Sequence, residues 1–119
     1  MEILPEVEVW YSLPAIRRKL ALTMKKQGIA QQEIAKQLHL APSAVSQYIT
    51  GKRGGSKLPK ELDEEFEKAA KNIITSKSST SKEIMRLNEL LKKTRHICDI
   101  HRQHSKDVPE NCKECFSNA

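Results

Sequence analysis

Hydrophobic residues recur at helical intervals in the first half of the chain. Ile16, Leu20 and Met24 lie four residues apart, which places them on one face of a helix. Ser12 precedes this pattern as the expected N-cap, and Gly28 ends it. The segment therefore predicts one long helix with one buried face.

Two shorter helical patterns follow between residues 29 and 53. Pro42 suits the first turn of the second helix, because a residue there needs no partner for its backbone N–H, and Gly51 ends that helix. The hydrophobic positions are Ile34, Ala35 and Leu38 in the first helix and Val45, Tyr48 and Ile49 in the second. Two short helices joined by a tight turn are typical of a helix-turn-helix, in which the small Ala35 permits a close crossing.

The first twelve residues show a period of two instead. Val7 and Val9 alternate with glutamates, which predicts a short extended segment with both valines on one side. Trp10 and Tyr11 are expected in the core.

After residue 53 the pattern predicts a joint and two further helices. Residues 54–57, with the sequence GGSK, are interpreted as flexible. The next helix is expected to bury Leu62, Phe66, Ala69, Ala70 and Ile73. Thr80 and Glu83 are expected to form the capping box of the following helix, whose hydrophobic stripe is Ile84, Leu87, Leu90 and Leu91. This stripe either contacts a second subunit or packs against the preceding helix.

Positive charge is concentrated on the predicted helix-turn-helix. The whole chain carries +6, but residues 14–57 hold nine Lys/Arg and one acid, Glu33. Residues 1–13 carry −3 and residues 58–119 carry +1. This distribution is the electrostatic pattern expected of a protein that contacts phosphates, and it predicts binding that weakens steeply with salt.

Length and composition limit the remaining possibilities. A chain of 119 residues with 38% hydrophobic and 4% aromatic residues predicts a small aliphatic core with no room for a large catalytic domain. No hydrophobic run is long enough for a membrane span, and no signal peptide is evident, so a cytoplasmic protein is expected. An enzyme is not expected, and no small-molecule substrate is evident.

The segment from residue 29 to residue 53 resembles the helix-turn-helix of phage repressors and Cro-like proteins. QQEIA corresponds to the first helix, and APSAVSQYITGKR supplies the recognition helix, residues 42–52. The resemblance implies base contacts from Pro42, Ser43, Ser46 and Gln47 in the major groove, and phosphate contacts from Gln31, Lys52 and Arg53. Arg17 and Arg18, on the preceding helix, are further candidates for the DNA backbone. His39 occupies the turn position usually held by glycine, and Ala30 and Ala41 replace the usual Ser or Thr caps.

All three cysteines of the chain lie near the C-terminus. Cys112 and Cys115 are separated by two residues, as are Cys98 and His101, and this pairing predicts a tetrahedral Cys3His zinc site. His104 and His96 are alternatives for the fourth ligand. An iron–sulfur cluster or an absence of metal remain open, whereas the odd number of cysteines disfavours a purely disulfide framework.

Taken over nearly its whole length, the chain resembles archaeal predicted transcriptional regulators that combine a Cro/repressor-type (XRE-like) helix-turn-helix with a Cys/His-bearing C-terminus. The matching segments are SLPAIRRKLA, IAQQEIAKQL, AVSQYITGKRG and the terminal Cys/His group. The resemblance adds a role in transcription.

The expected fold is all-α: a repressor-like helix-turn-helix bundle with a short N-terminal extended segment and a C-terminal helix ending in a Cys/His knuckle. Residues 1–57 would form the DNA-binding domain, residues 58–96 a support or dimerisation region, and residues 97–119 the metal-binding tail. The predicted function is sequence-specific binding of double-stranded DNA, as a homodimer, in transcription regulation. The alternative is an RNA-binding or antitoxin-like interaction protein without operator recognition.

Overall fold

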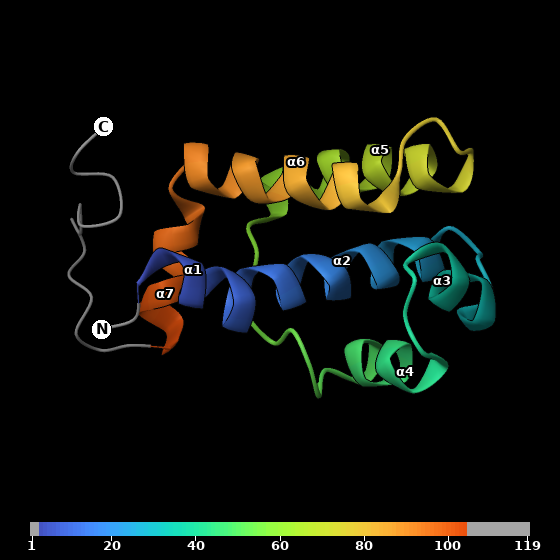
Figure 1. The fold of residues 1–119 in the computed structure, drawn as a ribbon, viewed down its shortest axis with the longest axis horizontal. Helices are drawn as coiled ribbons and strands as arrows, with labels where there is room; N and C mark the ends of the chain where they lie inside the picture. The colour runs from blue at the N-terminus through green and yellow to red at the C-terminus, as the bar shows by residue number, and fades with distance from the viewer. Residues whose placement is uncertain (1–2, 105–119) are drawn as a thin grey trace.

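The computed structural model describes residues 3–104, and within this range it contains helices and no strands (Figure 1). The elements are α1 (Leu4–Val7), η1 (Glu8–Ser12), α2 (Leu13–Lys26), α3 (Gln31–Gln37), α4 (Pro42–Thr50), η2 (Lys60–Leu62), α5 (Asp63–Ile74), α6 (Thr80–Lys93) and α7 (His96–His104). The expected all-helical class is therefore confirmed for the described residues.

The long helix α2 lies at the centre of the molecule. Helices α5 and α6 run side by side along one side of α2, and α3 and α4 pack near its C-terminal half (Figure 1). One connected cluster of buried hydrophobic side chains joins these elements, from Val7 at the N-terminus to Ile100 in α7. Ile16, Leu20 and Met24 of α2 are fully buried within it, as their spacing predicts.

The prediction of an extended N-terminal segment is wrong. Residues 4–12 are helical and continue directly into α2, through the π-helical turn η1. In that turn the N–H of Leu13 donates to the carbonyl of Glu8, five residues earlier. Pro14, which follows, has no N–H to donate and its ring needs space beside the carbonyl four residues back. A widened turn provides that space, so the helix continues past the proline.

Helical geometry changes the environment of several N-terminal side chains. Val7 is 1% exposed and Val9 is 61% exposed, so the two valines do not share a face. Trp10 is 54% exposed and is not a core residue, whereas Tyr11 is half-buried against the core. Ser12 is not an N-cap. It is buried inside the continuous helix, where its hydroxyl donates to Asn88 Oδ1 of α6 at 2.9 Å.

The hydrophobic stripe of α6 faces the rest of the same chain. Ile84, Leu87 and Leu91 are at most 8% exposed and belong to the common core, with Leu90 packed against it. The alternative of packing within the chain is therefore confirmed, and this stripe is not available as a dimer contact. The N-cap of α6 is Ser79, whose hydroxyl accepts from Lys82 N, and not Thr80 as predicted. Thr80 instead donates its hydroxyl hydrogen to the carbonyl of Gln37 at 2.5 Å, which ties α6 to α3.

The segment predicted as a flexible joint is docked onto the helices. Gly54 lies against the backbone of Pro14 in α2, and Ser56 is only 7% exposed. The backbone of Lys57 exchanges two hydrogen bonds with the side-chain amide of Gln103 in α7, at 2.8 and 3.1 Å. These contacts connect the C-terminal end of α4 to both α2 and α7.

Candidate nucleic-acid interface

Helices α3 and α4 are joined by a tight turn with one left-handed residue. His39 has a φ of 55°, the conformation that a glycine most easily adopts, and histidine tolerates it better than most side chains. The N–H of Leu40 then donates to the carbonyl of Ala35 at 2.9 Å, which closes α3. Histidine at this position is therefore compatible with the turn.

The two faces of α4 differ sharply. Its inner face is held by Val45, which is fully buried, and by Tyr48, which is 5% exposed. Its outer face presents Pro42, Ser43 and Ser46 to solvent, with Gln47 half-buried beside them. Since residues three or four apart share one side of a helix, Ser43, Ser46 and Gln47 form a continuous polar surface. The predicted base-contacting residues are thus brought together and remain accessible.

Cationic residues follow directly at the C-terminal end of α4. Gly51, with a φ of 84°, ends the helix in a left-handed conformation. Lys52 and Arg53 come next and are exposed, and the N–H of Arg53 donates to the carbonyl of Gln47 at 3.2 Å. Gln31, in the first turn of α3, is also exposed. Each of these predicted phosphate-contacting residues is accessible to a ligand.

Arg18 has a structural contact that the sequence did not indicate. Its Nε donates to the carbonyl oxygen of Tyr48, in the last turn of α4, at 3.0 Å. The same carbonyl accepts the N–H of Gly51 at 3.2 Å. Arg18 therefore fixes the end of α4 to α2, which makes it a positioning residue as well as a candidate phosphate contact. Arg17, its neighbour, is half-buried.

The proposed metal ligands are only partly within the described residues. Cys98 is half-buried and His101 is 3% exposed, and they lie three residues apart on α7. His96 Nδ1 is 3.1 Å from the hydroxyl of Thr94. Cys112 and Cys115 lie outside the described residues, as does the side chain of His104. Between residues 3 and 104 no three His, Cys, Asp or Glu side chains gather as a metal site would require.

Within the part of the chain that the structure covers, every helix is too short or too polar to cross a bilayer. Comparison with protein-family models, with curated proteins and with solved structures gives no match to this chain.

Proposed function

We propose that this protein binds double-stranded DNA sequence-specifically and regulates transcription, with α4 in the major groove. The observation that carries the proposal is the polar surface of the exposed Ser43 and Ser46 and the half-buried Gln47, on a helix whose opposite face packs against the core. A helix held in this way can enter a groove without exposing hydrophobic residues.

The surrounding charge supports the same proposal. Lys52 and Arg53 are exposed at one end of α4, and the only acid between residues 14 and 57 is Glu33. Glu33 accepts a hydrogen bond from Gln37 Nε2 at 2.9 Å and lies on α3, not on α4. A DNA backbone following the polar surface of α4 would thus meet cations rather than carboxylates.

The proposal includes a homodimer, because helix-turn-helix proteins of the repressor type bind paired half-sites about one DNA turn apart. The stripe of α6 does not supply the contact, since it is buried within the chain. Sedimentation of the free protein and of its DNA complex would give the number of subunits. A single subunit on the selected DNA would contradict the dimer without affecting the assignment of α4.

Selection from random duplex DNA tests the proposal. We expect enrichment of a palindromic sequence with half-sites about 10 base pairs apart, bound with an affinity that falls steeply between low and physiological salt. The same selection with random RNA tests the alternative. Enrichment of RNA alone, or binding of all duplexes with equal affinity, would contradict operator recognition.

We also propose a zinc site at the C-terminus, in which Cys98 and His101 act with Cys112 and Cys115. Donors three residues apart on one face of a helix can contact a single ion, and Cys98 and His101 of α7 have this spacing. An iron–sulfur cluster on the same cysteines is the alternative, and it would be recognised by visible absorption.

A further inference from the structure

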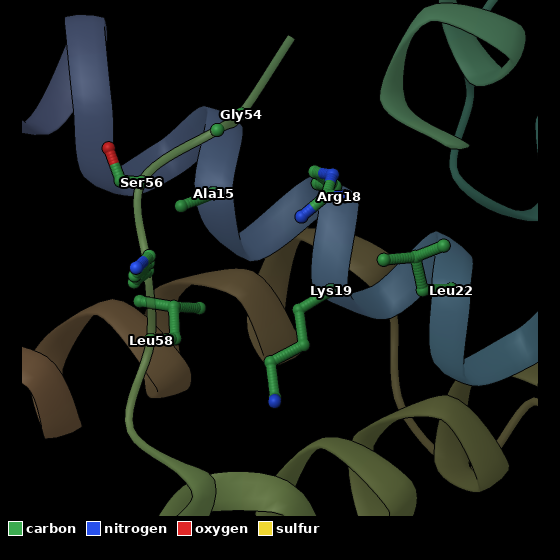
Figure 2. A pocket seen from close by; sticks show the side chains of 9 residues that line it. Ala15, Arg18, Lys19, Leu22, Gly54, Ser56 and Leu58 are labelled. Carbon is green, nitrogen blue, oxygen red and sulfur yellow. The ribbon is translucent and has the colours of Figure 1, made fainter. Parts of the chain in front are cut away.

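A small groove separates α2 from the segment that follows α4. Figure 2 shows Arg18 and Lys19 on α2, with the segment that carries Gly54, Ser56 and Leu58 running past them. The groove has a volume of about 300 Å³. Its lining residues are Ala15, Arg18, Lys19, Leu22, Gly54, Gly55, Ser56, Lys57 and Leu58. Three of these side chains are cationic and none is acidic.

The three cationic side chains differ in the ion pairs and hydrogen bonds that they already make. Lys19 is neutralised in part by Asp63 of α5, with Nζ 2.5 Å from Oδ1. Arg18 uses only Nε for the carbonyl of Tyr48, so its two Nη nitrogens have no hydrogen-bond partner within residues 3–104. Lys57 bonds to Gln103 through its backbone, which leaves its ammonium group exposed. Arg18 and Lys57 therefore offer uncompensated donors on two sides of one groove.

The rest of the lining has two relevant properties. Gly54 and Gly55 contribute no side chains, so the groove stays open between the cations. Leu22 and Leu58 supply a hydrophobic surface beside them. A concave site with a hydrophobic wall and a few convergent polar groups is the usual form of a small-molecule site, and this volume is at the small end of the range.

We propose that this groove binds a small organic anion through a phosphate or carboxylate group. The Nη donors of Arg18 and the ammonium of Lys57 hold the anionic group, because a guanidinium presents paired donors to two oxygens. A short hydrophobic part of the same molecule contacts Leu22 and Leu58. The groove is too small for a large ligand.

Arg18 connects this site to the proposed DNA-binding helix. Arg18 lines the groove and also holds the end of α4 through its Nε. An anion bound there neutralises Arg18, which is itself a candidate phosphate contact at the end of α4, and therefore weakens DNA binding. By thermodynamic linkage, DNA weakens anion binding by the same factor. This coupling rests on the proposed function, whereas the anion site does not.

Titration calorimetry with inorganic phosphate, at ionic strength held constant with chloride, tests the site without DNA. We expect saturable binding of one phosphate per chain and at least a fivefold loss of affinity in Lys57→Ala. Lys71→Ala is the matched control, because Lys71 is exposed on α5 and has no ion pair with residues 3–104. Absence of saturation, or an equal loss in both variants, would overturn the site.

A second experiment tests the coupling between anion binding and DNA binding. Phosphate at constant ionic strength is expected to lower DNA affinity severalfold in the natural protein and to have a smaller effect in Lys57→Ala. Equal DNA affinity with and without phosphate would overturn the coupling and leave the anion site standing. If no duplex binds under any condition, the proposed function is contradicted. The calorimetric titration with phosphate still shows whether the groove binds an anion.

Discussion

Gly54 packs directly against Pro14, so that a methyl group on Gly54 would overlap the carbonyl of Pro14 and the Cβ of Arg18. Gly54 also has a φ of 67°, a backbone conformation that residues other than glycine rarely adopt. The neighbouring Gly55 has neither restriction, since an added Cβ would approach nothing closer than the Gly51 carbonyl at 4.0 Å. Two adjacent glycines thus have different structural roles.

We expect Gly54→Ala to lower the free energy of unfolding by roughly 1–3 kcal/mol, because the backbone must either keep a strained conformation or move away from α2. Gly55→Ala should change it by less than about 0.5 kcal/mol. Urea denaturation of the two variants measures the difference. Equal stabilities would mean that the segment after α4 is not held against α2.

The same segment shows why only part of the arrangement could be predicted from the sequence. Gly-Gly-Ser-Lys is typical of a flexible joint, and nothing local to it indicates that Pro14 or Gln103 will contact it. The helices α2, α4 and α5 could be predicted, because the period of their hydrophobic residues is a local signal. The hydrogen bond from Arg18 to the carbonyl of Tyr48 joins residues far apart in the chain, so the local spacing of residues does not predict it.

The N-terminal helix could not be predicted for a different reason. Val7 and Val9 alternate with glutamates over too few residues to separate an extended segment from a helix. A proline shortly after a serine is typical of a helix start, but the π-turn allows the helix to continue through Pro14. The partner of Ser12, Asn88 of α6, could not be found from local sequence. The observed contact explains why Ser12 is buried.

Gln47 and Arg53 should differ in how they affect DNA binding. Gln47 lies on the polar surface of α4, where a side-chain amide can pair with the edge of an adenine, so Gln47→Ala should cost about 1–3 kcal/mol at one operator position only. Arg53→Ala should weaken binding to all duplexes alike and reduce the salt slope by about one. Titrations of both variants against operator and single-substituted duplexes measure this. An equal loss from Gln47→Ala on every duplex would contradict the placement of α4 in the groove.

Glu65 and Arg86 should make stability depend on pH. The hydrogen bond from Arg86 to Glu65, at 2.6 Å between Nη1 and Oε2, lowers the pKa of the Glu65 carboxyl and joins α5 to α6. The pKa of this carboxyl is lower in the folded state than in the unfolded state, where it is about 4.3. Ionised Glu65 therefore stabilises the folded protein at pH values above the unfolded pKa. This stabilisation is lost as the pH falls through the folded pKa.

Glu65→Gln should therefore be less stable than the natural protein at neutral pH, by less than about 1 kcal/mol because the pair is partly exposed, and the difference should shrink below about pH 4. Glu64→Gln is the control, since Glu64 is exposed on the same helix and pairs with no cation in residues 3–104. Thermal denaturation across this pH range provides the comparison. A difference that persists at pH 3 would show that Glu65 acts through packing and not through its charge.

The proposed zinc site should couple the C-terminal tail to the stability of α7. Ile97 and Ile100 fix this helix to the core, and Cys98 and His101 lie on the same helix, so an ion that also binds Cys112 and Cys115 would hold the tail against it. Cys112→Ser should lose the metal and lower the melting temperature, whereas Ser117→Ala should change neither. Elemental analysis and thermal denaturation of protein purified without air measure both effects. A colourless protein that contains zinc would support the zinc site. Visible absorption together with bound iron would favour the iron–sulfur cluster. Unchanged metal content and melting temperature in Cys112→Ser would exclude Cys112 as a ligand.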